Sequence, residues 1–406
     1  MAEDAFAWFV GIDWASREHV VTVLDVHGGI AGQRVVAHSG AGLQELTDWL
    51  LAQSGGHSER VAVAIELSRG PVVESLLSRG FAVFGINPKQ LDRFRDRYTM
   101  AGAKDDRRDA FVLADTLRTD RARYRRLQLG DPALVALRAL VESAEELATE
   151  LRQQTNRLCA LLERYYPQVL ALCPGADEAW VWSLLEVAPT PDAAQRVRAV
   201  RWTRLLKAHR IRRFDASVLM RTVREPALPL APGVADAVSG QVRLLIARLR
   251  LAHAQRARCE QKIERALAAL EADPASDAAI VRSLPGVGAS VSAALLVDAS
   301  ALLAARDGGA LRSHAGIAPV TRQSGRRKVV VMRRACNDRL RRALYHWSRC
   351  SVQRSQRSRA IYAAARARGQ SHGRALRGLA DRLLRMLIAM LRTRTPYDPA
   401  RTSAPA

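Results

Sequence analysis

The segment FAWFVGID at residues 6–13 decides the fold, because it is a short apolar run that ends on a carboxylate. Such a run is typical of a buried β-strand. The β-branched segment HVVTVLD at residues 19–25 follows it and leads into His27-Gly28-Gly29, which is a hairpin signal. Residues 30–37 then return as a third strand. We therefore expect the chain to begin with three strands in a meander.

Helix and strand patterns alternate after the meander. Helical spacing is found at residues 43–51, 72–77 and 106–117, and apolar strand patterns at residues 60–66 (RVAVAIE) and 81–86 (FAVFGI). Asn87-Pro88 ends the fifth strand and starts a further helix. Three meander strands followed by helix–strand–helix–strand–helix is the order of an α/β ribonuclease-H-like domain. We predict this domain for residues 1–128.

Two long helical segments follow, at residues 133–166 and 234–270, with apolar side chains at three-and-four spacing. Facing helices of this length form either an antiparallel coiled-coil arm or dimerisation element, or the core of a helical bundle. The sequence leaves both open, and we assign residues 129–272 to a coiled-coil or helical linker and dimerisation region. A mostly α C-terminal domain is expected at residues 273–395, and a disordered tail at 396–406.

The chain is strongly basic and nucleic acid is its expected partner. Its 406 residues include 63 Lys or Arg and 40 Asp or Glu, which gives a net charge of +23. Five of the basic residues are Lys, so an Arg-rich genome contributes to the excess. However, residues 320–395 hold twenty-one Lys or Arg against two Asp. Genome composition does not concentrate charge in this way, and a basic segment is typical of nucleic-acid binding.

Other sequence features limit the class of protein. Five cysteines are scattered without C-x-x-C pairs or zinc spacing, which predicts reduced thiols (Cys159, Cys173, Cys259, Cys336 and Cys350). The N-terminus lacks a signal-peptide pattern. No apolar stretch is long enough for a membrane span, so a cytoplasmic protein without a membrane partner is expected.

Four carboxylates of the first domain are candidate metal ligands. Asp13 and Glu66 end strands that are neighbours in this fold, and Asp106 and Asp109 share one face at the start of a helix. Converging carboxylates repel one another unless divalent cations neutralise them, and oxygen ligands select Mg²⁺ or Mn²⁺. A pair of such ions supports phosphoryl transfer. The alternative is solvated strand ends and an acidic first helical turn.

The C-terminal part carries two further motifs. Gly286 and Gly288 lie in LPGVGA (residues 284–289), a helix-hairpin-helix signature whose backbone N–H groups contact phosphate without reading sequence. Ser324-Gly325 lies among Arg322, Arg326, Arg327 and Lys328. A serine hydroxyl among guanidinium groups attacks a phosphodiester or contacts it passively, and the residues alone favour the passive role.

These motifs resemble those of the Piv/MooV-type DEDD transposases, the insertion-sequence 110 family. GID at residues 11–13, IE at 65–66 and KDDRRDA at 104–110 resemble its DEDD motif. PGVG at 285–288, AGIAP at 315–319, SG at 324–325 and CNDRLR at 336–341 resemble its C-terminal transposase domain. The family has a Thr where Asp105 stands, which leaves open whether Asp105 or Asp106 is the third acidic position.

The resemblance implies a RuvC-like nuclease domain joined through a coiled coil to a second catalytic domain. It makes Asp13, Glu66, Asp106 and Asp109 metal ligands and Ser324 a nucleophile that forms a phosphoserine link to DNA. It also implies a structured guide RNA that bridges element ends and target DNA, and a dimer or tetramer with composite sites. Candidate nucleic-acid contacts are Gly286, Gly288, Arg322, Arg326, Arg327, Lys328, Arg333, Arg334 and Arg341.

Three alternatives compete with this function. A RuvC-like Holliday-junction nuclease would cut by metal-activated water with Ser324 passive. A sugar-kinase or actin-like ATPase shares the sheet order, but it expects a second Gly-rich phosphate loop, which the sequence lacks. A catalytically inactive nucleic-acid-binding scaffold does not require the four acidic residues that are all present. The Arg-rich tail after Cys350 is a further candidate for RNA or DNA contact.

Overall fold

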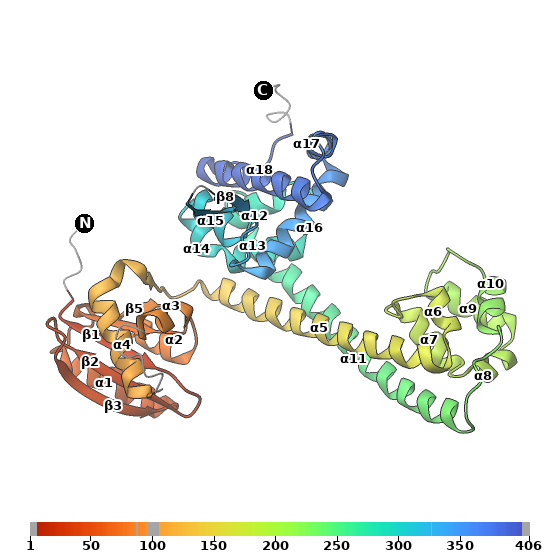
Figure 1. Cartoon of the computed structure of the whole chain (residues 1–406), viewed down its shortest axis with the longest axis horizontal. Coiled ribbons are helices and arrows are strands. Elements are labelled where there is room, and N and C mark those ends of the chain that lie inside the picture. The colour runs from red at the N-terminus through yellow and green to blue at the C-terminus, as the bar shows by residue number, and fades with distance from the viewer. Residues whose placement is uncertain (1–5, 87, 96–104, 326, 400–406) are drawn as a thin grey trace. The chain divides into compact units, whose positions relative to one another are not determined.

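The strands predicted for the N-terminal part form one mixed sheet in a computed structural model of the chain (Figure 1). The structure describes residues 6–86, 88–95, 105–325 and 327–399. The chain folds into two compact units, Met1–Asp131 and Pro132–Ala406. Among the described residues, none of the helices is long and apolar enough to cross a bilayer.

The sheet of the first unit has the strand order β3-β2-β1-β4-β5-β6. The strands are β1 (Trp8–Asp13), β2 (Glu18–Leu24), β3 (Ile30–Ala37), β4 (Val61–Ile65), β5 (Ala82–Gly85) and β6 (Arg125–Arg126). The first three are antiparallel neighbours, which confirms the meander, while β1, β4 and β5 run parallel. The expected contact between the first and fourth strands is therefore present. The edge strand β6 was not expected.

Helices cover both faces of this sheet. The unit contains α1 (Gly40–Gln53), η1 (Ser58–Arg60), α2 (Pro71–Ser78), α3 (Pro88–Arg95), α4 (Asp106–Asp120) and η2 (Arg121–Arg123). Val10 and Ile12 of β1 pack with leucines of α1, whereas Phe9 lies in the core formed with α4. Alternate residues of each strand therefore enter different cores, as the two-residue period of a strand requires.

Gly11 is the point at which α4 lies closest to β1. A Cβ on this residue would be 1.9 Å from the Ala110 carbonyl oxygen and 2.6 Å from the Ala114 nitrogen. Both neighbours are backbone atoms of a helix and cannot move independently. Glycine at this position therefore sets the distance between the helix and the strand end.

Gly11→Ala is expected to destabilise the first unit by about 3 kcal/mol or more, because the whole helix must shift outward. Hydrogen exchange of the β1 and α4 amides, followed by mass spectrometry, measures the loss. Gly40→Ala is the matched control, since its added Cβ meets no atom within 4 Å. Equal protection in both variants would show that α4 does not pack as described.

His19 of β2 contacts His38, the residue after β3. The Nε2 of His19 lies 3.0 Å from the Nδ1 of His38, and the Nδ1 of His19 accepts from the Ala15 N–H at 3.3 Å. His19 is fully buried. Burial, and then the neighbouring His38, lowers the pKa of His19. The folded unit therefore favours the neutral imidazole, in which Nδ1 accepts and Nε2 donates.

Acid is expected to destabilise this unit. Because the pKa of His19 is lowered by folding, the unfolded chain binds a proton first as the pH falls below about 6.5. The contribution of His19 is thus complete above that pH and declines below it, by at most about 1.4 kcal/mol per pH unit. Hydrogen exchange of β2 between pH 7.5 and 5.5, corrected for intrinsic exchange, measures this. His19→Gln should flatten the profile, and replacing the exposed His57 should not.

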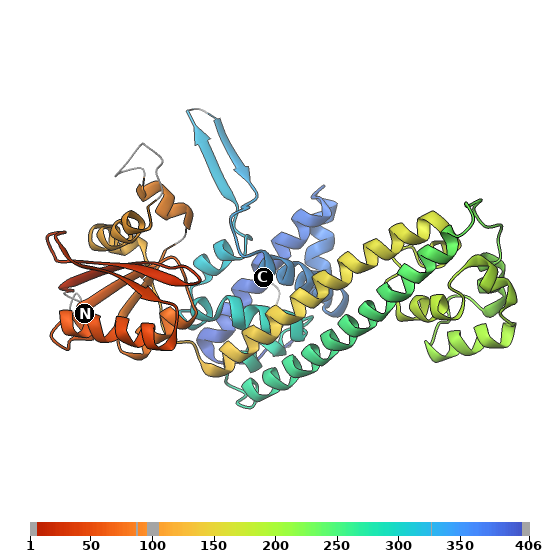
Figure 2. The same ribbon diagram turned by 90° about the horizontal axis from the view of Figure 1, so that it is seen from below.

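The second unit is built on two long helices that lie side by side (Figure 2). They are α5 (Pro132–Tyr165) and α11 (Val234–Leu270), close to the predicted ranges. Leu137 of α5 shares a core with Leu267 of α11, and Leu158 of α5 shares a second core with Val242 of α11. The start of each helix therefore meets the end of the other, and the pair is antiparallel.

The core around Leu158 and Val242 is shared with a group of short helices that lie between α5 and α11 in the sequence. They are α6 (Gln168–Leu172), α7 (Ala179–Val187), α8 (Pro191–Arg196), α9 (Ala199–Ala208) and α10 (Ala216–Val223). Three buried tryptophans, Trp180, Trp182 and Trp202, fill this core. We call these helices the tip group, because they lie at one end of the α5–α11 pair (Figure 1).

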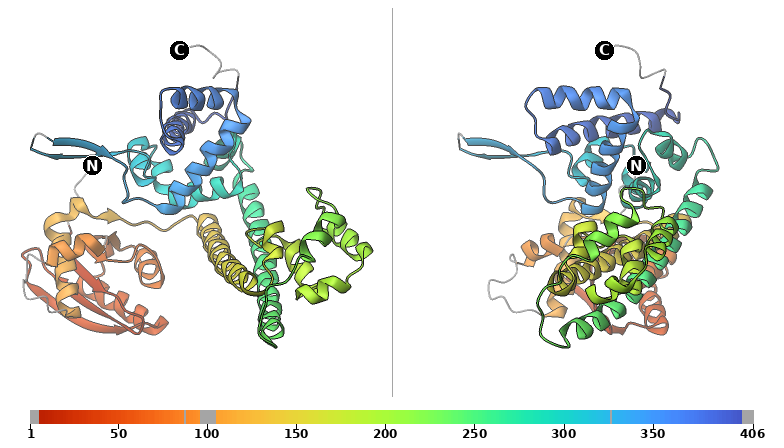
Figure 3. Two further views of the ribbon diagram at one scale, coloured as in Figure 1. Left: turned by 45° about the vertical axis from the view of Figure 1, so that its right-hand side comes forward. Right: turned by 90° about the vertical axis from the view of Figure 1, so that its right-hand side faces the viewer.

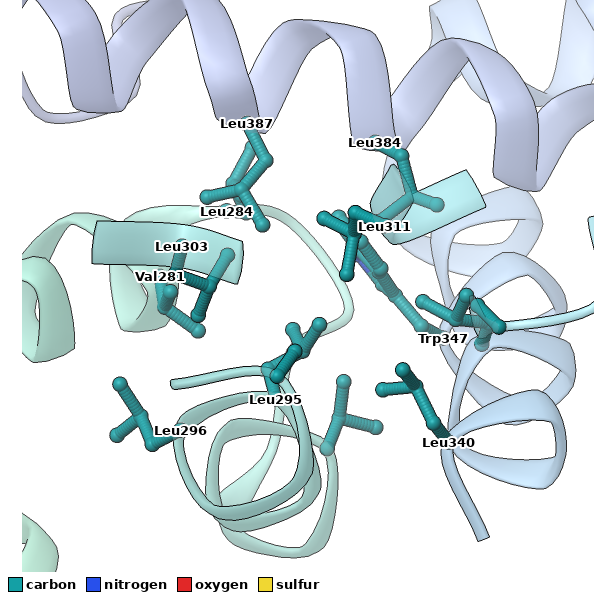
Figure 4. Close-up of a cluster of buried hydrophobic side chains, with 14 of the residues drawn as sticks. Val281, Leu284, Leu295, Leu296, Leu303, Leu311, Leu340, Trp347, Leu384 and Leu387 are labelled. Carbon is teal, nitrogen blue, oxygen red and sulfur yellow. The ribbon is translucent and has the colours of Figure 1, made fainter. Parts of the chain in front are cut away.

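The other core belongs to the C-terminal helices, α12 (Asp277–Ser283), α13 (Ala289–Asp298), α14 (Ser300–Ala304), α15 (Gly308–His314), α16 (Asp338–Arg354), α17 (Gln356–Ala367) and α18 (His372–Thr393). Figure 4 shows Leu295 of α13, Leu340 and Trp347 of α16 and Leu384 of α18 meeting in it. The apolar face of α18 is thus buried. Tyr397 donates its N–H to the Ser283 Oγ at 2.9 Å, so the prediction of disorder from residue 396 does not hold there, and residues 400–406 lie outside the described residues.

A hairpin of β7 (Val320–Ser324) and β8 (Arg327–Val331) extends from these helices (Figures 2 and 3). Most of its residues are exposed, including Val330 at 62%. The C-terminal domain is therefore mostly α, as expected, but it presents one bare two-stranded ribbon.

Candidate active site

Asp13 and Glu66 are brought together by the register of β1 and β4. The parallel ladder pairs Gly11 with Ala64 and Ile12 with Ile65. One further step places Glu66, the residue after β4, beside Asp13, the last residue of β1. Neighbouring strands lie about 4.8 Å apart, so the two carboxylates start from adjacent backbone positions.

The same two residues continue the sheet face that α4 covers. Asp13 follows Phe9 and Gly11 at two-residue spacing, and Glu66 follows Ala62 and Ala64. Phe9, Ala62 and Ala64 all lie in the core formed with α4. The alternation therefore assigns Asp13 and Glu66 to the face on which that helix lies.

The direction of α4 puts its first turn at this end of the sheet. The guanidinium of Arg121, just after the helix, stacks over the ring of Phe6, before β1, at 5.2 Å. Ala110 meets Gly11 near the other end of the strand. The helix is therefore antiparallel to β1, and its N-terminus approaches Asp13. Asp106 lies one turn before Ala110 on the same helix face.

The three aspartates of this turn have different environments. Asp105 is the N-cap, and its carboxylate accepts the Arg107 N–H at 3.1 Å. Asp106 is exposed, whereas Asp109 is only 3% exposed. Asp105 thus has a capping role of its own, and which of Asp105 and Asp106 is the third acidic position stays a prediction.

The donor set suits a hard divalent cation, since every candidate is a carboxylate. Asp13, Glu66 and Asp109 each have an interaction partner. Within the described residues, however, no group of three or more His, Cys, Asp or Glu side chains is arranged to hold a metal ion. The backbone thus brings Asp13 and Glu66 together and directs the start of α4 toward them, but the four carboxylates do not form a closed ligand cluster.

Ser324 ends β7 at the tip of the hairpin. It pairs with Arg327, and Gly325 follows it with φ +54°, a backbone conformation that favours glycine. Ser324 is exposed. Among the described residues, no carboxylate or imidazole hydrogen-bonds its hydroxyl.

The basic residues near Ser324 are divided between the two faces of the hairpin. Residues paired across strands share a face, so Arg327 and Arg322 lie on the face of Ser324. Lys328 pairs with Gln323 and lies on the opposite face. Arg326 lies outside the described residues. Two of the four predicted cations thus share a face with the hydroxyl.

The other arginines predicted to contact nucleic acid differ in whether their guanidinium groups are already bound within the chain. Arg334 is exposed, whereas Arg333 donates to the Ala318 carbonyl at 3.4 Å. Arg341 lies 2.7 Å from the Asp338 carboxylate and contacts Cys336. Its guanidinium is therefore already paired within the chain.

The turn between α12 and α13 is held by the chain itself. The Pro285 carbonyl accepts from the Trp347 Nε1 at 3.1 Å and from the Ser351 Oγ at 2.7 Å. Gly286 has φ +82°, and a Cβ there would lie 2.6 Å from the Ser351 nitrogen. Packing against α16 thus explains Gly286, which the sequence had indicated as a phosphate contact. Gly288 is the exposed N-cap of α13 and has no side-chain cap.

Two family models match the chain. A DEDD-type model described as a transposase matches residues 10–167, and a model of the transposase IS116/IS110/IS902 family matches residues 278–363. The mini-circle putative transposase for IS117 of Streptomyces coelicolor is 33% identical over 100% of this chain and 99% of its own length. The chain belongs to the IS110 family of transposases.

Other members of this transposase family are also similar. A putative transposase, y4uE, of Sinorhizobium fredii is 48% identical over 54% of this chain, and the chain covers 61% of that protein. The 44.8 kDa protein of insertion element IS116 of Streptomyces clavuligerus is 29% identical over 97% of the chain. The protein is thus an insertion-sequence transposase, an enzyme that cleaves and joins DNA.

The matched regions contain both parts of the candidate site. The first contains Asp13, Glu66, Asp106 and Asp109 and continues through α5, beyond the end of the first unit. The second contains the LPGVGA turn and Ser324 but ends before α18. A DEDD-type domain implies a ribonuclease-H-like fold, in agreement with the observed strand order.

Proposed function

We propose that this transposase cleaves and rejoins DNA strands with four carboxylates and one serine. Asp13, Glu66, Asp106 and Asp109 would hold Mg²⁺ or Mn²⁺, and Ser324 would be the nucleophile. The observation that supports the proposal is the strand register: Ile12 pairs with Ile65, so β1 and β4 end side by side, at Asp13 and just before Glu66. A bound cation would neutralise the carboxylates and the phosphate and favour phosphoryl transfer.

The serine step conserves the energy of the phosphodiester bond. The Ser324 Oγ loses its proton and bonds to phosphorus, and the bond from phosphorus to one deoxyribose oxygen breaks, leaving a hydroxyl there. Attack by a deoxyribose hydroxyl of another strand reverses these changes and frees the serine. Arg322 and Arg327, on the face of Ser324, would stabilise the charge on the phosphate.

The proposal includes an assembly of more than one chain and a guide RNA. The carboxylates and Ser324 belong to different compact units. As the family resemblance implies, the site would be composite: one subunit of a dimer or tetramer would supply the carboxylates and another the serine. A structured RNA encoded by the element would align its ends with the target DNA, as in the family that the motifs resemble.

Metal removal tests the carboxylate site. We expect a DNA substrate with both element ends to be cleaved in Mg²⁺ or Mn²⁺ and to remain intact in EDTA, because four carboxylates cannot approach a phosphate without a cation. Gel analysis of end-labelled DNA measures cleavage, and Mg²⁺ added back after EDTA is the control. Cleavage in EDTA would contradict the metal site.

A second candidate is a junction nuclease in which water attacks and Ser324 is passive. The observation that favours it is the Ser324 hydroxyl, which lacks a hydrogen-bonded carboxylate or imidazole in the described part of the chain. The two functions differ in whether a covalent protein–DNA link forms.

A further inference from the structure

A second basic surface lies in the tip group, far in sequence from the basic C-terminal segment. Residues 196–213 contain eight Lys or Arg and no Asp or Glu. We define the α9 patch as seven of these residues: Arg196, Arg198, Arg201, Arg204, Lys207, Arg210 and Arg212. All seven are exposed. The eighth, Arg213, is bound to Glu178 at 2.7 and 3.1 Å and is excluded.

The charges of the α9 patch are not compensated within the described chain. None of its seven side chains forms an ion pair with a described carboxylate. The acidic residues that bracket the patch lie in the first turn of α8 and at the N-cap of α10, where Asp215 is bound to Ser217 and Val218. Elsewhere arginines pair with acids, as Arg250 does with Glu186 and Arg256 with Glu260. An Arg-rich composition alone therefore does not explain the patch.

Three cations of the α9 patch lie on one side of helix α9. Its inner face is buried through Trp202, Leu205 and Leu206. Arg201, Arg204 and Lys207 occupy the opposite half of the helix at three-residue steps. From Arg201 to Lys207 the helix rises about 9 Å. Duplex DNA presents about five phosphates over that length, so there are enough phosphates for each of the three cations.

The composition of the patch selects among possible partners. Membrane-surface helices need an exposed apolar face, but the apolar face of α9 lies in the core of the tip group. Protein interfaces have an apolar or aromatic centre, and the only large apolar side chain exposed on α9 is Val200, at 70%. A row of unpaired cations fits a polyanion, and the polyanion that a transposase acts on is DNA.

We propose that the α9 patch binds the phosphodiester backbone of duplex DNA outside the cleavage site. The partner rests on the proposed function, since both take DNA as the substrate. Binding through phosphates reads no sequence, so the patch would hold flanking DNA of any sequence at the tip group.

A charge-matched pair of variants tests this proposal in the full chain. The first carries Arg201→Gln, Arg204→Gln and Lys207→Gln. The second removes three exposed cations from the part of α11 that leads to the C-terminal helices, through Arg258→Gln, Lys262→Gln and Arg265→Gln. Fluorescence anisotropy with a labelled 30-bp DNA duplex in EDTA gives affinity without cleavage. A 30-bp RNA duplex is measured in parallel.

The α9 variant is expected to bind DNA about 100-fold more weakly at 0.1 M salt, and the slope of log K against log salt should fall by about 2.7. The α11 variant should stay within about threefold of wild type, because exposed charges act only over about 10 Å at this salt concentration. Arg201→Lys with Arg204→Lys should retain binding, which separates loss of charge from misfolding.

Three results would overturn the proposal: unchanged DNA affinity in the α9 variant, equal loss in both variants, or loss for the RNA duplex but not for DNA. None of these measurements involves cleavage. If DNA binding depends on the α9 patch while wild type never cleaves DNA, the proposed function fails and the DNA contact stands. If the α9 variant binds normally and cleavage requires Asp13, the reverse holds.

Discussion

Asp13→Asn is expected to reduce DNA strand cleavage by about 10³-fold or more, while DNA affinity changes little. Asp13 ends β1 next to β4, which Glu66 follows, and α4 runs antiparallel to β1 with its start toward this end. An amide there lowers the negative charge that would hold a cation. A 10³-fold loss in rate corresponds to about 4 kcal/mol less stabilisation of the transition state. Affinity should persist because the basic residues, which bind phosphates, are untouched.

Cleavage of end-labelled DNA and anisotropy measure the two effects separately. Glu66→Gln should behave like Asp13→Asn, since the two residues occupy adjacent positions. Glu74→Gln is the control: it removes a carboxylate from the exposed side of α2 and should leave cleavage unchanged. Normal cleavage by Asp13→Asn would exclude this end of the sheet as the catalytic centre.

Ser324→Ala is expected to abolish the covalent protein–DNA species completely. The hydroxyl at the hairpin tip is the group that would bond to phosphorus, and alanine has no oxygen with which to do so. Denaturing gels with labelled DNA and protease treatment detect the species. Ser313→Ala, a partly exposed serine on α15, is the matched control.

The same variant distinguishes the two candidate functions. If metal-dependent nicking continues at the wild-type rate in Ser324→Ala and no covalent species forms in wild type, water is the nucleophile. If joining and nicking both disappear with the covalent species, the serine is the nucleophile. A covalent species that persists in Ser324→Ala would assign the link to another residue.

The sheet could be predicted from the sequence because its central strands carry their signal locally. VAVAI in β4 is buried at every position, and such a continuous apolar run is typical of a parallel strand covered on both faces. Arg125–Arg126 in β6 carries no apolar signal and is a strand only through its pairing with β5. The individual helices of the tip group were not predicted within the helical region at 129–272, because they are defined by tryptophans that pack against α5 and α11.

The candidate site was predictable to different extents. The adjacency of Asp13 and Glu66 was expected from strand parity and order, and the observed pairing of Ile12 with Ile65 agrees with it. The contact of Gly286 with Ser351 was not predictable, since it depends on the three-dimensional packing of α16, whereas the pairing of Arg341 with Asp338 is a local contact within that helix. Whether the four acids and Ser324 act in catalysis stays a prediction.

The hairpin has a consequence for when this enzyme can act. Ser324 is the last of the five residues of β7, so it lies about 14 Å from the first residue of that strand. The hydroxyl at the end of this ribbon has no hydrogen-bonded carboxylate or imidazole within the second unit as described, and nucleophilic attack requires alignment to within fractions of an ångström. An unassembled subunit should therefore not cleave chromosomal DNA. Strand cleavage would begin only when a partner surface fixes the end of the β7–β8 hairpin.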